Sequence, residues 1–267
     1  MCCAVAGFLA VSVSADSEAD WQKLVLSGIQ AAGAGNFANS EASLLKATQL
    51  AEHFPPGDPR TGTTLNTLGL VYKEEKKYGD AEKTFQQALG ILEKAYGPTS
   101  LDVGNVSFNI AAVLLADGHF DTAVPYIERS RAVYEKILGA DSLKTASTYC
   151  MIGEAYRNLK RFSEAEGPLK QCADMREESG GVDNPDLADA LYNLALVFEH
   201  QGKYALADPR LKMAEKIREL KFGVTSPEFA EALEAHAALL RLMNRDAEAA
   251  RDEAMLAAIR RAAPKAK

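Results

Sequence analysis

Residues 64–98 read TLNTLGLVYKEEKKYGDAEKTFQQALGILEKAYGP, and residues 190–220 read ALYNLALVFEHQGKYALADPRLKMAEKIREL. Both stretches place small, aromatic and apolar residues in the same order, and this order returns every 42 residues along the chain. Three columns show it most clearly: Ala81, Ala123, Ala165, Ala207 and Ala249; Tyr78, Phe120, Phe162 and Tyr204; Gly97, Gly139, Gly181 and Gly223. A fixed period of this length predicts a repeat architecture, in which each unit packs on its neighbours.

Each 42-residue unit carries the end signals of two helices. Good N-cap residues recur at the unit's start: Asp58, Ser100, Ser142, Asn184 and Ser226. We expect a first helix of about 17 residues after each cap, with apolar residues such as Leu65, Leu68 and Tyr72 along one side. A turn column follows, in which a left-handed residue closes the helix: Lys76, Gly118, Lys160, Gly202 and Asn244. A second helix then runs to the Gly97 column.

These signals predict an all-α fold, a right-handed α–α superhelical solenoid of about six helical hairpins. The expected domains are a single solenoid over residues 16–263 and a short basic tail over residues 264–267. The expected repeats are residues 21–57, 58–99, 100–141, 142–183, 184–225 and 226–263. In the last repeat, Asp246 replaces the aromatic residue of the Tyr78 column, and Glu253 stands in the Phe85 column. This polar face predicts a capping end, where no further repeat packs.

The small residues after Leu68, the aromatic residue Tyr72, and Ala81, Phe85 and Ala88 resemble the tetratricopeptide repeat signature. The 42-residue step is similar to that of the long repeats of kinesin light chain. This resemblance covers about nine tenths of the chain. It implies a concave groove, lined by the first helix of each hairpin, that holds peptides or segments of partner proteins. It does not imply a motor role, because fold does not fix function.

The exposed stripe of the first helices supplies the candidate partner-binding residues. They are Asn66, Lys73, Phe108, Asn109, Leu115, Arg157, Tyr192, Asn193, Leu196 and Glu199. The middle of the stripe is apolar, which indicates either an interaction site or tight packing between neighbouring first helices. The resemblance places Asn109 and Asn193 where family members commonly have an asparagine that reaches a bound peptide's main chain. The alternative for these two amides is a hydrogen bond between adjacent helices.

Charge and motifs narrow the classes of function. The net charge of -7 disfavours a nucleic acid partner. Charges on the stripe are mixed, so no basic clamp for a carboxylate is expected. The four His are scattered, and no recognised catalytic, phosphate-binding or metal-binding motif occurs. His236 is expected to be a partly buried, hydrogen-bonded residue. The sequence therefore predicts no enzyme, no catalytic residue, no metal site and no cofactor.

The N-terminal run MCCAVAGFLAVSVSA, residues 1–15, is uncharged and too short to span a bilayer. It resembles the apolar segment of a secretory signal, with Val13-Ser14-Ala15 fitting a cleavage site before Asp16. No basic residue precedes it, and the alternative is an apolar N-terminal helix that covers the first hairpin. We expect an exported protein, periplasmic or secreted, if the leader is genuine, and a cytoplasmic protein otherwise. The mature chain is expected to have no integral membrane segment.

Cleavage of the leader would leave Cys150 and Cys172 as the two cysteines of the chain. Their spacing fits no metal site. We expect two isolated buried thiols, with a disulfide as the alternative that an oxidising compartment would permit.

Together these features predict a non-enzymatic scaffold that binds a protein or peptide through the first helices. The alternative is a cytoplasmic regulator of the same fold that responds to a signalling peptide.

Overall fold

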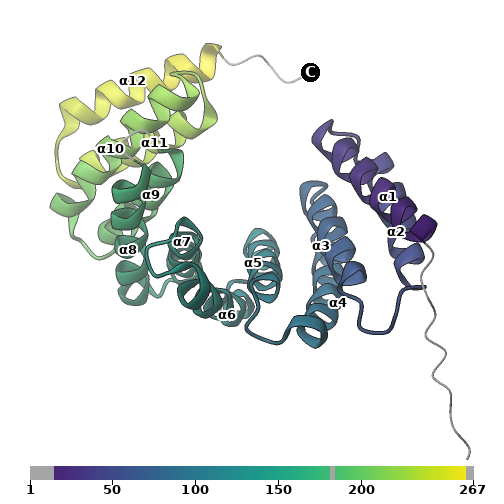
Figure 1. Cartoon of the computed structure of the whole chain (residues 1–267). Helices are drawn as coiled ribbons and strands as arrows, with labels where there is room; N and C mark the ends of the chain where they lie inside the picture. Colours follow the sequence, from purple (N-terminus) through teal and green to yellow (C-terminus); the bar gives the residue numbers. More distant parts are fainter. Residues whose placement is uncertain (1–14, 181–183, 263–267) are drawn as a thin grey trace, which may run out of the picture. The chain divides into compact units, whose positions relative to one another are not determined.

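The computed structural model describes residues 15–180 and 184–262, which form twelve α-helices and no strand (Figure 1). The helices are, in chain order, α1 (Ala15–Gly33), α2 (Phe37–Ala51), α3 (Pro59–Glu74), α4 (Tyr78–Tyr96), α5 (Leu101–Ala116), α6 (Phe120–Leu138), α7 (Leu143–Asn158), α8 (Phe162–Gly180), α9 (Pro185–His200), α10 (Tyr204–Phe222), α11 (Pro227–Leu242) and α12 (Asp246–Ala262). The predicted all-α class and the six helical hairpins are confirmed. The leader prediction, up to Ser14, and the basic tail lie outside the described residues.

The first hairpin begins earlier than expected, because α1 starts at Ala15 instead of near Trp21. Two contacts hold the start of α1 against α3, one from Glu18 in the added turn and one from Trp21 just after it. The Trp21 indole N–H donates a hydrogen bond to Thr64 Oγ1 at 3.0 Å, and Glu18 forms an ion pair with Arg60 at 3.2 Å. The sequence pattern missed this turn because residues 15–20 read ADSEAD and contain no large apolar residue.

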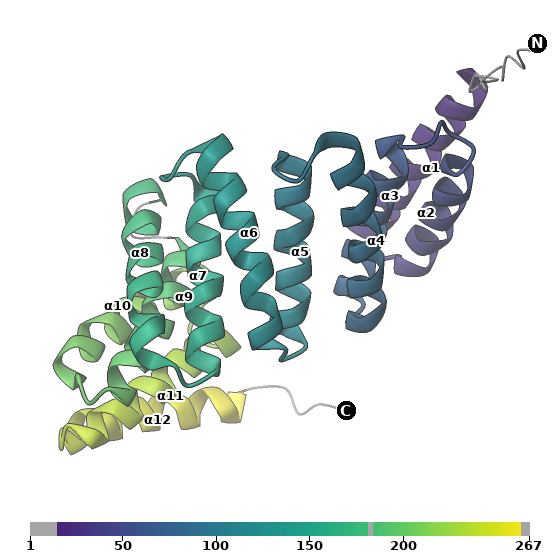
Figure 2. The ribbon, with the colours of Figure 1, turned by 90° about the horizontal axis from the view of Figure 1, so that it is seen from below.

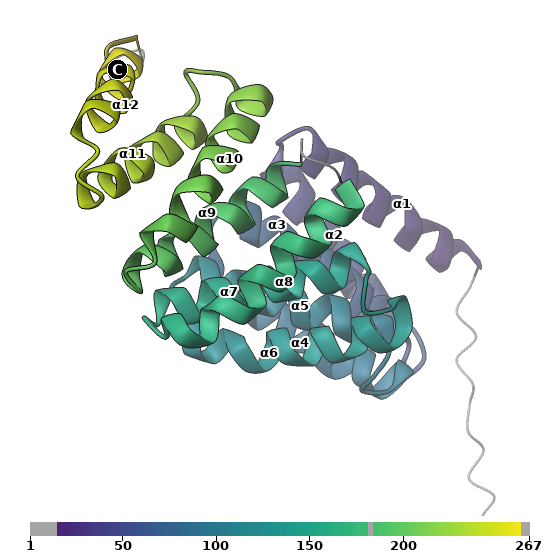
Figure 3. The ribbon, with the colours of Figure 1, turned by 90° about the vertical axis from the view of Figure 1, so that its left-hand side faces the viewer.

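The chain divides into two compact units, Met1–Val133 and Tyr134–Lys267, with the division inside α6. In the first unit, α2 packs on α3 and α4 packs on α5. In the second unit, α8 packs on α9, and α11 packs on both α10 and α12 (Figure 3). Within the two units, α2, α4, α8 and α10 therefore each pack on the first helix of their own hairpin and on that of the next one, as a repeat architecture requires.

The predicted helix ends are confirmed at both kinds of boundary. Side-chain oxygens of the N-cap residues accept backbone hydrogen bonds at the starts of α3, α5, α7, α9 and α11. The turn column adopts positive φ even where it holds a side chain, with φ of 59° at Lys76, 60° at Lys160 and 57° at Asn244. These local signals fix where each helix of a hairpin begins and ends.

Close packing inside each hairpin depends on small residues. All five alanines of the column led by Ala81 are 0% exposed. Helices α3 and α4 form one such hairpin (Figure 2). A Cβ added at Gly69 of α3 would lie 2.6 Å from the Phe85 ring of α4, so the absence of a side chain at Gly69 allows this close approach. The periodic small residues therefore mark the contact line between the two helices of a hairpin.

The two cysteines of the second unit form a disulfide between α7 and α8, so the expectation of isolated thiols was wrong. Cys150 is half-buried and Cys172 is fully buried, and their Cα atoms lie 5.2 Å apart. This separation is within the range that a disulfide spans without movement of the backbone. The antiparallel packing of one hairpin brings the cysteines face to face.

Candidate functional site

The candidate residues lie on α3, α5, α7 and α9, which are first helices of their hairpins. We call this set of residues the first-helix face. In the unit Met1–Val133 it comprises Asn66 and Lys73 of α3 and Phe108, Asn109 and Leu115 of α5. In the unit Tyr134–Lys267 it comprises Arg157 of α7 and Tyr192, Asn193, Leu196 and Glu199 of α9.

Two asparagines of the first unit are joined across neighbouring helices. Asn109 Nδ2 donates a hydrogen bond to Asn66 Oδ1 at 2.9 Å, and both side chains are half-buried. No other described residue bonds these two side chains, which leaves Asn66 with an unused NH₂ and Asn109 with an unused carbonyl oxygen. The amide pair thus offers one donor and one acceptor in fixed positions.

The other candidates of the first unit differ in what they can offer a partner. Lys73 Nζ lies 3.3 Å from Glu74 Oε1 at the end of α3. Phe108 is half-buried next to the amide pair and provides apolar surface. Leu115 departs from the expectation, because it is only 9% exposed and packs into the core of α5. It lies on a helical face that the repeat pattern alone did not distinguish from the exposed stripe.

Tyr192 is the centre of a charged cluster in the second unit. The Arg218 guanidinium of α10 lies 4.6 Å from the centroid of the Tyr192 ring. Arg218 is 4% exposed and donates to Asp189 Oδ1 at 2.9 Å and to Glu231 Oε2 at 3.0 Å. Burial and the nearby Glu231 carboxylate raise the pKa of Tyr192 to about 12, so its hydroxyl remains a proton donor at neutral pH.

Arg218 belongs to a column that the sequence analysis missed. Arg176, Arg218 and Arg260 are 42 residues apart on the second helices. Each pairs with a carboxylate of a first helix: Arg176 with Asp186 at 2.7 Å, Arg218 with Asp189, and Arg260 with Glu234 at 2.9 Å. The 42-residue spacing of the arginines was the available signal. These ion pairs tie second helices to first helices within the second unit.

Asn193 of α9 differs from Asn109, because no other described residue bonds its side chain. The matching position on α7 is Met151, which is buried and has no amide to offer. Asn193 is half-buried, and its side-chain amide has one NH₂ group and one carbonyl oxygen available for hydrogen bonds. Leu196 and Glu199 are half-buried on the same helix, and burial raises the pKa of Glu199.

Arg157 lines a hollow of about 430 Å³ near the end of α7. The Phe162 and His200 rings border the same hollow and stack with their centroids 4.3 Å apart. Arg157 also lies close enough to Tyr192 to lower the pKa of that hydroxyl, against the stronger effect of burial. The structure therefore brings Arg157 and Tyr192 together on the first-helix face.

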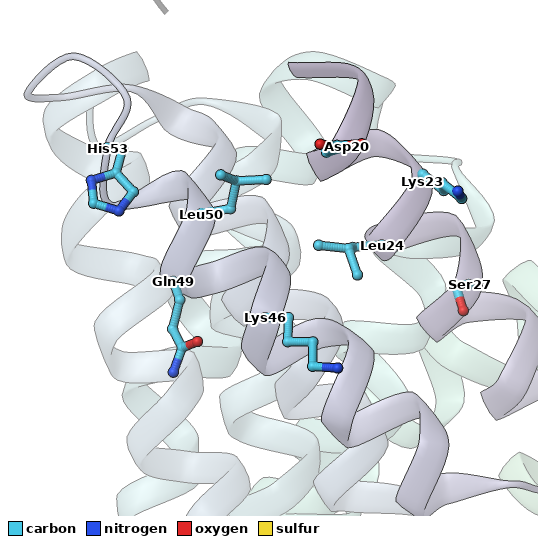
Figure 4. A pocket seen from close by; sticks show the side chains of 8 residues that line it. All are labelled: Asp20, Lys23, Leu24, Ser27, Lys46, Gln49, Leu50 and His53. Atoms are coloured by element: carbon cyan, nitrogen blue, oxygen red, sulfur yellow. The ribbon is translucent and has the colours of Figure 1, made fainter. Parts of the chain in front are cut away.

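The first hairpin carries a second hollow, of about 550 Å³, that the sequence did not predict. Leu24 of α1 and Leu50 of α2 project toward the space between the two helices, with Lys46 and His53 of the α2 side around them (Figure 4). Exposed Leu26 and Ile29 add apolar surface on α1. The lining mixes both signs of charge, so it selects no particular ligand.

His236 agrees with the expectation of a buried, hydrogen-bonded residue, since it is 4% exposed and its Nε2 lies 3.1 Å from Asp208 Oδ1.

None of the helices within residues 15–180 and 184–262 is both long and apolar enough to cross a membrane.

The sequence family follows from a comparison with family models. The tetratricopeptide repeat model matches residues 23–94, 62–136 and 102–178, which together cover more than half of the chain. The protein therefore belongs to the tetratricopeptide repeat family.

Solved structures support the same fold. The nearly identical TPR-like repeats of a kinesin-light-chain-like protein from Podosopora anserina superpose with a TM-score of 0.64 at 17% identity, covering 78% of this chain and 99% of that one. A Rap protein complexed with competence and sporulation factor superposes with a TM-score of 0.58 at 19% identity, covering 91% of this chain and 75% of that one. The predicted likeness to kinesin-light-chain repeats is confirmed.

A curated relative matches over a shorter stretch. The clustered mitochondria protein homolog of Aspergillus clavatus is 24% identical over 105 residues, which are 39% of this chain and 8% of that protein. The alignment thus spans a small part of the relative's length.

Proposed function

We propose that this protein is a non-enzymatic scaffold that binds an extended segment of a partner protein or peptide on its first-helix face. The observation that carries the proposal is the Asn66–Asn109 amide pair, which leaves one donor and one acceptor directed away from the pair's own hydrogen bond. An extended backbone presents the complementary carbonyl and N–H groups without regard to its side chains. The unpaired amide of Asn193 repeats this capacity in the second unit.

Apolar and charged groups beside the amides would add affinity for side chains of the partner. Half-buried Phe108 in the first unit, and Tyr192 and Leu196 in the second, provide apolar surface next to an asparagine. Glu199 and Arg157 bring both charges, so the partner segment need not have one sign. The Rap protein similar to this chain forms a complex with competence and sporulation factor, which supports ligand binding as a use of this fold.

Replacing Asn193 with Ala should weaken peptide binding about fivefold and leave stability within about 0.5 kcal/mol, because its amide bonds no other described residue. Asn109→Ala should weaken binding similarly and also cost about 1 kcal/mol of stability, since it breaks the bond to Asn66. Ligands would be selected from a displayed library of 12-residue peptides on the intact chain. Fluorescence anisotropy of one selected peptide would then measure affinity for each variant.

The matched control is Asn39→Ala, which removes an exposed asparagine from α2, away from the first-helix face. Its affinity for the selected peptide should equal that of the unchanged chain. Equal affinity in the Asn39, Asn109 and Asn193 variants would place the peptide elsewhere and contradict the proposed binding face. A library that yields no ligand tighter than about 100 μM would contradict peptide binding itself.

We further propose that the chain is exported, with residues 1–15 as its leader. The disulfide supports this proposal, because disulfides persist in oxidising compartments and are rare in the cytosol. Export would also argue against the alternative function, a cytoplasmic regulator that responds to a signalling peptide.

The mature protein from native cells should begin near Asp16 and should show no reaction of Cys150 or Cys172 with maleimide after denaturation without reductant. N-terminal sequencing and intact mass of each cell fraction would test both expectations. A cytoplasmic chain that retains Met1 and carries two labelled thiols at these positions would rule out export.

A further inference from the structure

Three helices of the second unit bring a histidine and two carboxylates together in the interior. His236 of α11 lies between Glu215 of α10 and Asp252 of α12. The His236 Nδ1 atom is 2.8 Å from Glu215 Oε1 and 3.0 Å from Asp252 Oδ2. The histidine side chain is 6% exposed, and the two carboxylates are 16% and 21% exposed. The cluster is therefore largely shielded from solvent.

None of the three facing atoms has a hydrogen-bond partner. Glu215 Oε1, His236 Nδ1 and Asp252 Oδ2 are all buried and unsatisfied. Buried polar atoms are normally bonded, so three such atoms at one point require an explanation. Among the described residues, no Lys or Arg forms an ion pair with either Glu215 or Asp252. Burial raises the pKa of both carboxyl groups.

Asp208 of α10 holds the opposite side of the imidazole. Its Oδ1 atom lies 3.1 Å from His236 Nε2, and it is itself anchored by Lys212 and Arg245, each at 3.0 Å. In the neutral imidazole, a carboxylate beside Nε2 favours the proton on that nitrogen and leaves a lone pair on Nδ1. In that tautomer Nδ1 and the two carboxylate oxygens are three acceptors that face one another.

We propose that Glu215, His236 and Asp252 bind a divalent transition metal ion, with Zn²⁺ as the best fit, through Oε1, Nδ1 and Oδ2. Two ligand atoms about 2.1 Å from one ion lie about 3.0 to 3.4 Å apart, so the distances around Nδ1 need little adjustment. A nitrogen ligand beside two oxygens suits Zn²⁺, whereas Ca²⁺ and Mg²⁺ prefer oxygen alone. Three protein ligands leave a fourth position for water. Asp208 positions the imidazole, as carboxylates behind zinc-bound histidines do.

One residue of this proposed site departs from the repeat pattern of the sequence. His236 stands in a column whose other members, Leu68, Ile110, Ile152 and Leu194, are all apolar and buried. A metal ion there would join α10, α11 and α12 at the end of the repeat array. It would take the place of the apolar packing that the column provides in earlier hairpins.

Titration of the untagged, metal-free full chain with ZnCl₂ in a calorimeter should give one binding site. Asp252→Asn and Glu215→Gln should each weaken binding by at least about tenfold, and Asp208→Asn by about 10- to 100-fold. The matched control is Glu253→Gln, which removes a charge from the adjacent residue of α12. The Glu253 carboxylate instead pairs with Arg241 at 2.7 Å, so its loss should leave Zn²⁺ affinity within twofold.

X-ray absorption at the zinc edge of the loaded, unchanged chain gives a second readout that does not depend on folding of the variants. It should show nitrogen and oxygen ligands and no sulfur. The proposal is overturned if the folded metal-free chain takes up no Zn²⁺ at millimolar concentration, since His236 is then an imidazolium that neutralises the carboxylates. It is equally overturned if the Glu215 and Asp252 variants bind as tightly as the unchanged chain, because the ion then lies elsewhere.

Discussion

Loss of the Cys150–Cys172 disulfide is expected to lower the free energy of unfolding by about 3 kcal/mol. The bond closes a loop of 22 residues that contains the end of α7, the turn and the start of α8. A crosslink of this span restricts the unfolded chain much more than the folded hairpin, which is already antiparallel. Cys172 is fully buried, so a replacement must also fill its space in the core.

Cys150→Ala combined with Cys172→Ala keeps both positions small and apolar, and guanidinium denaturation would compare it with the oxidised chain. Added reductant should lower the stability of the unchanged chain toward that of the double variant. It should have no effect on the double variant itself, which controls for reaction at Cys2 and Cys3. Equal stability of the oxidised chain and the double variant, together with two free thiols before reduction, would mean that the bond does not form in solution.

The pairing register of the two helices in a hairpin explains why the cysteines meet. The same register could have predicted the disulfide from the sequence. Cys150 and Cys172 are each eleven residues from Arg161, at the turn between α7 and α8. Gly153 and Leu169, which touch in the structure, are each eight residues from the same turn. Residues at equal distance from the turn of an antiparallel hairpin therefore face each other. In the sequence analysis the cysteine spacing was compared only with metal-site patterns and not with this symmetry, so the Cys150–Cys172 pairing was missed.

The fold was predictable because its signals are local and repeated. Caps such as Ser142 and turn residues such as Lys160 act within one hairpin, and each of their 42-residue columns recurs five times along the chain. The arrangement of the candidate site residues was less predictable, because it depends on contacts between hairpins. The bond from Asn109 to Asn66 joins residues 43 apart, and no column records which rotamer an amide adopts. The burial of Leu115 likewise depends on how neighbouring helices cover it.

The charged clusters were predictable only in part. The arginine column of Arg176 and Arg218 was visible in the spacing. Its carboxylate partners were not, because Arg176 of α8 pairs with Asp186 of the following hairpin, whereas Arg218 of α10 pairs with Asp189 of its own hairpin. The cluster around His236 combines single residues from three helices, and only the histidine breaks an apolar column. Sequence periodicity thus reveals what every repeat shares and hides what one repeat does alone.

Gly153→Val is expected to destabilise the protein by about 3 kcal/mol. A Cβ added at Gly153 would lie 2.3 Å from Leu169 Cγ and 3.2 Å from the Leu169 backbone nitrogen. Leu169 is 0% exposed, and the atom in the way is the branch point of its side chain, so rotation of the terminal methyl groups does not relieve the clash. Helix α8 must therefore move away from α7, although the disulfide three residues from Gly153 holds the two helices together.

Gly153→Ala separates the steric effect from helix propensity. Alanine gains about 1 kcal/mol over glycine inside a helix, so the alanine variant should lose less stability than the valine variant. Gly90→Ala in α4 is the matched control, because nothing lies within 4 Å of a Cβ at that position. It should raise the free energy of unfolding by about 0.5 to 1 kcal/mol.

A double change tests the cause directly. If the cost of Gly153→Val arises from Leu169, it should fall by at least about 1 kcal/mol in a Leu169→Ala background, since the truncated side chain vacates the space that valine needs. Denaturation of the four chains of this cycle would measure the coupling. Gly153 belongs to a column of small residues on the first helices: Gly69, Ala111, Gly153, Ala195 and Ala237. Additive costs would show that Leu169 is not the obstacle and that this column has another origin. Coupling would establish this column as part of the contact line that sets the distance between the two helices of a hairpin.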